Sequence, residues 1–390
     1  MLSVDAAEAR ITAAFATLDS ENVALDDALG RTLAANAFAR HQQPPTPVSM
    51  MDGYAIIAGD QGSRKVIGIA PAGHPFGGRV NRGEAVRIFT GAPVPDGADA
   101  VIMQEKVTVT GDTISFGDVT AGRAIRPAGM DFRKNDVLAR AGQRLSARDL
   151  ALLAADDQGQ VFVRRRPVIA FAATGDELSR AGEPRKPGGI VASSAYGLKA
   201  MLAAWGAEPK DLGILPDTQK AIAGIAAAAA GADMIITLGG ASVGDHDIVQ
   251  SALGADFTLD FWKIAMRPGK PLIFGRLGAT PFMGLPGNPV STLVTALLFV
   301  RPAIEKMLGR ENPNHTRAAL LSGALGANDE RQDYLRASLE WREGQFWATA
   351  LPAQDSSMLR LFAQADCLIV RKPNAPALRH GEAVDILTLD

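Results

Sequence analysis

Three cationic side chains lie close together in a segment that two prolines constrain. Lys263, Arg267 and Lys270 fall within eight residues, and the sequence Pro-Gly-Lys-Pro occupies positions 268–271. Guanidinium and ammonium groups bind phosphates and other oxyanions through charge-assisted hydrogen bonds. A basic cluster is usually a solvated charged face, but such faces rarely carry two prolines. The segment therefore predicts a rigid cationic turn that binds phosphates or another oxyanion.

Glycine-rich loops follow three predicted strands, at residues 174–177, 239–247 and 287–289. Glycine lets the backbone approach a ligand closely, and a helix that begins at such a loop presents free amide groups to an anion. Asn288 as a helix cap with Pro289 as the first helical residue makes a start of this kind. Any one such loop is more often an ordinary turn, but three loops at one edge of a sheet favour a ligand site.

Acidic residues stand in the loops of the same region, at Asp176, Glu177, Asp217, Asp245 and Asp247. Carboxylates and phosphates share a cleft most readily when a hard divalent metal ion lies between them. Any one of these acids can instead cap a helix. For Asp217, which precedes an alanine-rich helix, the roles of metal ligand and helix cap are equally expected.

Residue usage disfavours thiol and zinc chemistry. Cys367 is the single cysteine, which excludes an internal disulfide and a CxxC site. It lies in an apolar run at 365–370 that predicts a strand, so a buried inert thiol is expected in preference to a nucleophile. The five histidines are scattered without metal-ligand spacing, which argues against a zinc enzyme.

Charge and hydropathy limit the partners. The net charge is −2, which offers no bulk attraction to nucleic acid or to an anionic membrane. The N-terminus does not have the pattern of a signal peptide, and every apolar stretch is broken before about 18 residues. We therefore expect a soluble, cytoplasmic protein that binds neither nucleic acid nor membrane.

The elements that must position these residues change in character along the chain. At about 150 residues per domain, 390 residues predict two to three domains or more. Prolines at 44, 45 and 47 mark one boundary. The predicted domains are a split helical linker domain over 1–43 plus 141–166, a β-rich insert domain over 44–140, an α/β domain over 167–311 and a C-terminal β domain over 312–390.

Apolar periodicity predicts the elements within these domains. Val4, Ile11 and Phe15 share one helix face that Ser3 can cap, and the pattern continues as helix over 25–39. Between 167 and 311, apolar strands alternate with helices, which predicts right-handed crossovers and a mostly parallel sheet. Ligands bind at the carboxyl ends of the strands in such sheets. The last of these helices is expected over 290–308, and short strands follow it.

Six motifs occur in order along essentially the whole chain, and each of them alone is weak. They lie at residues 51–55, 90–95, 174–178, 239–247, 266–271 and 284–289. Together they resemble the molybdopterin molybdenumtransferase family, also called MoeA, to which the gephyrin E domain is related. The resemblance implies an elongated homodimer of four-domain subunits whose third domain has the molybdopterin-binding fold. It also implies a site shared between the two subunits.

The reaction that the resemblance implies consumes adenylylated molybdopterin and molybdate, depends on a divalent metal, normally Mg²⁺, and releases AMP. Transient contact with molybdopterin adenylyltransferase and with molybdoenzymes is also implied. The catalytic residues it implies are Asp52, Thr90, Asp131, Glu177, Asp247, Lys263, Arg267 and Lys270. The substrate-binding residues it implies are Thr174, Gly175, Gly239, Gly240, Ser242, Gly287, Asn288, Arg331, Ser356 and Ser357. The metal ligands it implies are Glu177, Asp217 and Asp247.

Two other functions compete with this one. The adenylyltransferase of the preceding step shares the α/β fold but is normally a single domain of that kind. A gephyrin-like scaffold belongs with a longer fused chain that carries another domain and a linker. The β-rich insert and the additional domains of this chain favour the transferase.

Overall fold

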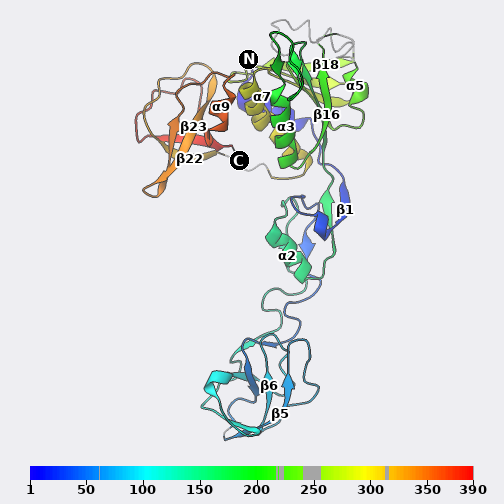
Figure 1. Cartoon of the computed structure of the whole chain (residues 1–390), viewed down its shortest axis with the longest axis vertical. Helices are drawn as coiled ribbons and strands as arrows, with labels where there is room; N and C mark the ends of the chain where they lie inside the picture. The colour runs from blue at the N-terminus through cyan, green and yellow to red at the C-terminus, as the bar shows by residue number, and fades with distance from the viewer. Residues whose placement is uncertain (61, 217, 219–223, 240–255, 312–315, 390) are drawn as a thin grey trace. The chain divides into compact units, whose positions relative to one another are not determined.

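The computed structural model describes residues 1–60, 62–216, 218, 224–239, 256–311 and 316–389, and the chain divides into two compact units (Figure 1). Unit 1 comprises Met1–Glu21, Gly30–Thr32 and Arg164–Asp390. Unit 2 comprises Asn22–Leu29 and Leu33–Val163.

A six-stranded sheet forms the centre of unit 1. Its strands follow the order β16 (Glu208–Leu215), β13 (Val168–Thr174), β17 (Met234–Leu238), β21 (Thr280–Leu285), β20 (Pro271–Leu277) and β18 (Phe257–Lys263). The first four strands run parallel, and the last two pair antiparallel. β13 and β17 are nearly continuous apolar runs because both of their faces are buried. The predicted mostly parallel sheet is confirmed, with β18 as an additional edge strand.

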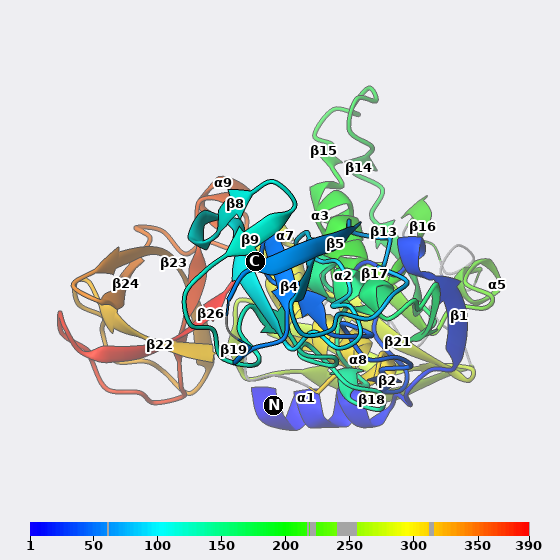
Figure 2. The same ribbon diagram turned by 90° about the horizontal axis from the view of Figure 1, so that it is seen from below.

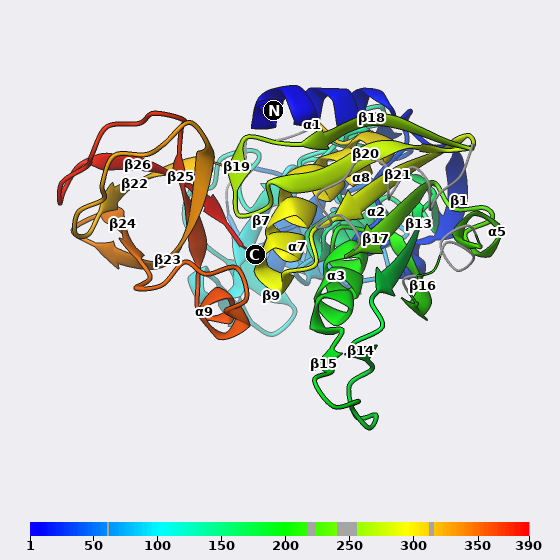
Figure 3. The same ribbon diagram turned by 90° about the horizontal axis from the view of Figure 1, so that it is seen from above.

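Helices cover the two faces of this sheet, and alternate strand residues divide between them. Ile169 and Phe171 pack into the larger core, and Ala170 packs into the smaller core with Ile225. The larger core lies under α1 (Val4–Ala13), α3 (Ser193–Ala204), α7 (Pro289–Thr295), a π-helical segment (Ala296–Val300) and α8 (Arg301–Met307), several of which are labelled in Figure 3. The smaller core lies under α5 (Ile225–Ala228).

Two predicted helical features are found in unit 1. The hydroxyl of Ser3 accepts a 3.2 Å hydrogen bond from the amide of Ala6, so Ser3 caps α1 as predicted. The helix expected over 290–308 is present, but its middle turn is π-helical.

The C-terminal strands of unit 1 close on themselves. β23 (Gln332–Arg342), β24 (Gln345–Ala350), β22 (Thr316–Leu321), β26 (Ala383–Thr388) and β25 (Cys367–Arg371) pair in that order, and β25 returns to β23. Figure 2 shows these strands as a group beside the main sheet. Cys367 is buried in the core of this barrel-like domain, and burial raises the pKa of its thiol to about 12. The expected burial of this thiol is confirmed, and its raised pKa disfavours the reactive thiolate form.

Three smaller features complete unit 1. β19 (Met266–Arg267) pairs in parallel with β23. β14 (Leu178–Ser179) and β15 (Ile190–Val191) pair with each other and form an arm that extends from the sheet in both Figure 2 and Figure 3. The short helix α9 (Leu359–Ala363) precedes β25.

Unit 2 contains a second six-stranded sheet and two-stranded ladders. The sheet order is β7 (Ala100–Met103), β4 (Gly53–Ile56), β6 (Glu84–Ile88), β5 (Arg64–Ala70), β9 (Thr113–Ser115) and β8 (Thr108–Thr110). The ladders join β3 (Val48–Ser49) to β10 (Ile125–Arg126), β2 (Ala37–Phe38) to β11 (Val137–Ala139), and β1 (Ser20–Ala24) to β12 (Gln160–Arg164). The helix α2 (Ala147–Ala155) begins at a capping box of Ser146 and Asp149.

One predicted element is wrong. Residues 25–39 were expected to be helical, but they form a single 3-10 turn (Leu25–Asp27), loop and the strand β2. Gly30 has a φ of 73°, which a right-handed helix cannot contain. Ala28 and Leu33 are nevertheless buried in the core around α2, so their apolar spacing reflects burial from irregular backbone. Within the described residues, no helix is long and apolar enough to cross a membrane.

Candidate functional site

The carboxyl ends of three parallel strands bring the glycine-rich loops together. The amide of Gly239 donates to the carbonyl of Leu285 at 3.1 Å, which ties the end of β17 to the end of β21. Gly239 has a φ of 100°, and a Cβ at this position would lie 2.8 Å from the carbonyl oxygen of Thr174. A Cβ on Gly287 would lie 3.7 Å from the Cα of Gly239. Thr174, Gly239 and Gly287 therefore meet at one sheet edge.

The neighbouring predicted residues fall into two groups. Gly175 lies beside Thr174, and its amide donates to the carbonyl of Leu215 at 3.2 Å. The predicted residues Gly240, Ser242, Asp247 and Asp217 lie outside the described residues.

The start of α7 is joined to a loop of the C-terminal domain. Asn288 stands at the N-cap position with Pro289 as the first helical residue, as predicted. Its side-chain amide donates to the hydroxyl oxygen of Ser356 at 2.8 Å. The amide of Val290 donates to the carbonyl of Ser356 at 3.0 Å, which satisfies a first-turn donor of α7. The structure thus places Ser356 at the helix start that follows the third loop.

A buried arginine holds the loop that carries Ser356. Arg336 is 2% exposed, and its guanidinium donates to the side-chain oxygen of Gln354 at 3.1 Å and to the carbonyl of Asp355 at 2.8 Å. The side-chain amide of Gln354 donates back to the carbonyl of Arg336 at 3.0 Å. Sequence reasoning missed both residues, although a cation between the apolar residues of a predicted strand was a signal. They act together as a clamp on the loop.

Ser357 completes this loop by contacting Asp355. The hydroxyl and amide of Ser357 donate to one carboxylate oxygen of Asp355, at 2.5 Å and 2.8 Å. These two hydrogen bonds lower the pKa of Asp355. Asp355 therefore stays ionised at neutral pH and fixes the turn beside Ser356.

The predicted cationic turn is packed against α7. Gly269 has a φ of 110°, and a Cβ there would lie 2.4 Å from the Cγ2 atom of Thr295. Only glycine allows the turn to approach the helix this closely. Lys270 is exposed at the end of the turn. The ammonium group of Lys263 lies 3.4 Å from the ring centroid of Trp262, which is a cation–π contact.

The pairing of β19 with β23 brings two arginines from distant parts of the sequence together. Arg267 is the register partner of Asp333 in this ladder. The guanidiniums of Arg267 and Arg331 both donate to the same carboxylate oxygen of Asp329, at 2.6 Å and 3.1 Å. The family resemblance implies Arg267 as a catalytic residue and Arg331 as a substrate-binding residue, and the structure places both of them against Asp329.

Glu177 is the one predicted metal ligand within the described residues. It is exposed just beyond β13, and a Cβ on Gly175 would lie 2.6 Å from one of its carboxylate oxygens. The other two members of the predicted set, Asp217 and Asp247, lie outside the described residues. Among the side chains that the structure describes, no group of three histidines, cysteines or acids is arranged to hold a metal ion.

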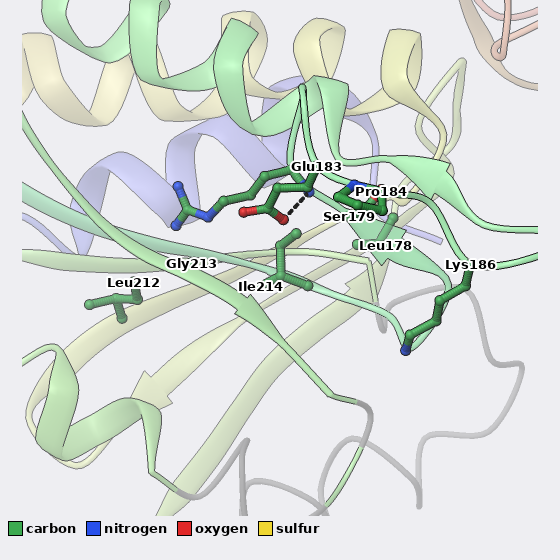
Figure 4. A pocket seen from close by; sticks show the side chains of 9 residues that line it. Leu178, Ser179, Glu183, Pro184, Lys186, Leu212, Gly213 and Ile214 are labelled. Atoms are coloured by element: carbon green, nitrogen blue, oxygen red, sulfur yellow. Dashed lines mark hydrogen bonds between the residues drawn. The ribbon is translucent and has the colours of Figure 1, made fainter.

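A polar depression of about 480 Å³ adjoins the segment that carries Glu177 (Figure 4). Glu183 and Lys186 lie on one wall, and Leu212 and Ile214 of β16 lie on the other. The ammonium group of Lys186 donates to the carbonyl of Asp176 at 2.9 Å. Sequence reasoning did not identify this depression, because the residues that line it come from two separate segments.

Asp52, Thr90 and Asp131 are the predicted site residues that lie in unit 2. The hydroxyl and amide of Thr90 both donate to one carboxylate oxygen of Asp52, at 2.9 Å and 2.8 Å. The Thr90 amide, the Thr90 hydroxyl and the charge of Arg87 lower the pKa of Asp52. Asp131 is exposed in another loop, where its amide donates to the carbonyl of Gln43 at 2.9 Å.

Several polar groups of unit 1 are suited to binding oxyanions. The side-chain amide of Asn288, the hydroxyl of Ser356 and the paired guanidiniums of Arg267 and Arg331 are donors of the kind that recognise phosphates and tetrahedral oxyanions. No cysteine takes part, so the described residues offer no thiolate ligand for a soft metal.

Known families cover almost the whole chain. The MoeA N-terminal region (domain I and II) matches residues 2–156, a probable molybdopterin binding domain matches residues 170–306, and the MoeA C-terminal region (domain IV) matches residues 318–389.

Curated relatives and solved structures are similar over the same length. The molybdopterin molybdenumtransferase of Haemophilus influenzae is 35% identical over 94% of this chain and 93% of its own. The molybdopterin molybdenumtransferase of Bacillus subtilis is 34% identical over 95% of this chain and 90% of its own. The crystal structure of a molybdopterin biosynthesis MoeA protein from Pyrococcus horikosii matches with a TM-score of 0.86 at 28% identity, covering 100% of this chain and 99% of that one.

Proposed function

Because the chain belongs to the molybdopterin molybdenumtransferase family, we propose that it inserts molybdate into adenylylated molybdopterin with release of AMP. The family consists of enzymes of molybdenum cofactor biosynthesis. In the proposed step the two dithiolene sulfurs replace two oxygens of molybdate, which leave as water. A water molecule cleaves the pyrophosphate link, which leaves a phosphate on the pterin and releases AMP.

The observation that supports this reaction most is the presence in unit 1 of two sets of anion-binding groups, one at the start of α7 and one where β19 pairs with β23. Asn288 and Ser356 present an amide and a hydroxyl at the start of α7, and Arg267 and Arg331 present two guanidiniums. Both molybdate and the pyrophosphate link are oxyanions, which such donors stabilise. The dithiolene supplies the sulfur ligands of molybdenum, which agrees with a chain whose one cysteine is buried in the barrel.

A divalent metal ion, normally Mg²⁺, is proposed as the cofactor of the reaction. The donor chemistry fits this ion, because all three proposed ligands, Glu177, Asp217 and Asp247, are carboxylates. Of these, Glu177 is described, and it is exposed at the sheet edge where the loops meet. When bound, the ion would neutralise phosphate charge. Full turnover in the presence of excess chelator would refute the proposal that the reaction needs a divalent metal ion.

Two other functions make different predictions for the same assay. A molybdopterin adenylyltransferase would consume molybdopterin and ATP and release pyrophosphate. A gephyrin-like scaffold would release no AMP from adenylylated molybdopterin. The test is to incubate the protein with adenylylated molybdopterin, molybdate and Mg²⁺ and to follow AMP by chromatography. Molybdate-dependent AMP release supports the transferase. No AMP release when adenylylated molybdopterin, molybdate and Mg²⁺ are all present refutes it.

We also propose a homodimer in which each active site uses residues of both subunits. Under this proposal the partner's Asp52 serves the same site as Asp247. Asp52→Ala and Asp247→Ala homodimers should each be inactive and should recover activity when they are unfolded and reassembled together. Random pairing makes about half the dimers mixed, with one intact site each, so recovery should approach about a quarter of wild type. Recovery no greater than in the parents, with subunit exchange verified by mass spectrometry, would refute the shared site.

The remaining partners are proposed on the family resemblance. We expect the protein to act in the cytoplasm and to make transient contact with molybdopterin adenylyltransferase and with the molybdoenzymes that receive the product. Its net charge of −2 supports the absence of a nucleic-acid partner.

A further inference from the structure

We propose that Asp329 is an internal stand-in for the oxyanion substrate: it occupies the anion-binding faces of Arg267 and Arg331, and the substrate displaces it. The proposal rests on the proposed function in one respect, because it takes the displacing oxyanion to be molybdate. It makes Asp329 a residue that sets the affinity of the site for oxyanions.

The contacts of Asp329 are those expected for a bound oxyanion. One carboxylate oxygen accepts from the Nη2 atoms of both Arg267 and Arg331, at 2.6 Å and 3.1 Å. The other oxygen accepts from the backbone amide of Arg331 at 3.0 Å. Two guanidiniums and a backbone amide from two separate segments thus converge on a single anion. The same donors suit a tetrahedral oxyanion that presents several acceptor oxygens.

Arg267 also pairs with a second carboxylate, that of Asp333, which is more buried than that of Asp329. Asp333 is 8% exposed and forms an ion pair with Arg267, in which a carboxylate oxygen lies 3.1 Å from the Nε atom. It also lies opposite Arg371 in the ladder of β23 and β25. Asp333 therefore acts as a permanent counter-ion that keeps Arg267 in place. Asp329, whose side chain is 39% exposed, contacts the face of the guanidinium that solvent can reach.

The backbone around Asp329 is anchored, so its displacement needs only a rotation of the side chain. The side-chain amide of Asn328 donates to the carbonyls of Arg331, Arg371 and Lys372, at 2.7 Å, 3.1 Å and 2.9 Å. The carbonyl of Asp329 accepts from the amide of Asn374 at 2.7 Å. Ion pairs between exposed side chains contribute little to the stability of the fold, so release of Asp329 from the arginines leaves the fold intact.

Asp329 is a competitor under all working conditions. The side chain and the amide of Arg331, together with the charge of Arg267, lower the pKa of Asp329 to about 2. The carboxylate is therefore charged throughout the neutral range. An oxyanion must compete with it at every pH at which the protein is folded and active.

The test measures oxyanion binding directly, without turnover. Asp329→Asn keeps the size of the side chain and an acceptor for the amide of Arg331, but it removes the charge. Molybdate is titrated into the full-length wild-type protein and into the variant by calorimetry. We expect Asp329→Asn to bind molybdate about ten-fold more tightly. Glu330→Gln is the matched control, because Glu330 is an exposed neighbour and its substitution changes the net charge equally; we expect it to bind like wild type.

Four results would overturn the proposal. Unchanged binding in Asp329→Asn would show that the carboxylate does not compete, and weaker binding would show that it positions the arginines instead. Equal tightening in Glu330→Gln would assign the effect to net charge. A double variant, Asp329→Asn with Arg331→Gln, must also lose the gain, and melting curves verify that each variant is folded. Failure of the transferase assay would refute the proposed function but would leave this binding result standing.

Discussion

The side-chain amide of Asn288 donates a 2.8 Å hydrogen bond to the hydroxyl oxygen of Ser356, and these residues come from different domains of unit 1. Asn288 stands at the start of α7, and Ser356 lies in the loop between β24 and α9. The contact connects the glycine-rich edge of the main sheet to the barrel-like C-terminal domain. Through Ser356, the C-terminal domain therefore contributes a side chain to the candidate site.

Ser356→Ala removes the acceptor of this hydrogen bond and should lower the rate of AMP release about 3–10-fold, the range that corresponds to one hydrogen bond. The fold should persist, because the amide of Val290 still bonds to the carbonyl of residue 356. Steady-state kinetics at saturating molybdate measures the effect. Ser322→Ala, which changes a serine elsewhere in the barrel, should retain wild-type activity. Full activity in Ser356→Ala would contradict the assignment.

Gly239→Ala places a Cβ 2.8 Å from the carbonyl oxygen of Thr174, at a φ of 100°. We expect a loss of about 2–4 kcal/mol in the free energy of unfolding and a fall in AMP release of at least about ten-fold. Gly278→Ala is the matched control, because Gly278 has a φ of 60° but nothing within 4 Å of its Cβ position. It should lose about 1–2 kcal/mol and keep its activity. Denaturant melts measure the stability of both variants, and steady-state kinetics measures their rates of AMP release. Equal activities of the two variants would contradict the expectation that the site needs a residue without a side chain at position 239.

Gln354→Ala leaves the buried guanidinium of Arg336 without one of its acceptors. The expected cost is about 1–3 kcal/mol in the free energy of unfolding, since a buried donor loses its partner. Gln345→Ala, at an exposed position in β24, should change stability by less than about 0.5 kcal/mol. Chemical denaturation of both variants is the measurement. If the two variants prove equally stable, Gln354 does not serve as a clamp.

Thr90→Val tests the environment of Asp52 in unit 2. The Thr90 amide, the Thr90 hydroxyl and Arg87 lower the pKa of Asp52 below its ordinary value of 3.8. The ionised form therefore stabilises the fold at pH values above 3.8, and this contribution is lost as the pH falls through the lowered pKa. Valine removes the hydroxyl donor but keeps the amide, so the pKa of Asp52 should rise part of the way back. Carboxyl chemical shifts followed by NMR would show this rise, and an unchanged pKa would contradict the role of the hydroxyl.

Much of the fold could be predicted, because buried strands and helices carry apolar residues at regular spacing in the sequence. β13 and β17 are apolar on both faces, and they lie where apolar strands alternating with helices were predicted between residues 167 and 311. The segment 25–39 could not be predicted, because its apolar residues pack from irregular backbone around a glycine of positive φ. β18 was missed because it is a half-buried edge strand whose exposed side chains interrupt the apolar pattern.

The site was predictable where its residues lie in loops after strands. The parallel order of β13, β17 and β21 places Thr174, Gly239 and Gly287 together, as the loops suggested. The acid partners of the arginines were not predictable, because they depend on the register that pairs Arg267 with Asp333. The clamp of Arg336 on Gln354 likewise depends on long-range pairing that no local pattern records.

The most direct test of the transferase assignment is to measure molybdenum and AMP in the same reaction. The protein is incubated with adenylylated molybdopterin, Mg²⁺ and molybdate, and pterin-bound molybdenum and free AMP are both quantified over time. The proposed function predicts that the two products accumulate in equal amounts and that neither forms when molybdate is omitted. AMP that accumulates at the same rate without molybdate, or that appears with no molybdenum on the pterin, would contradict it.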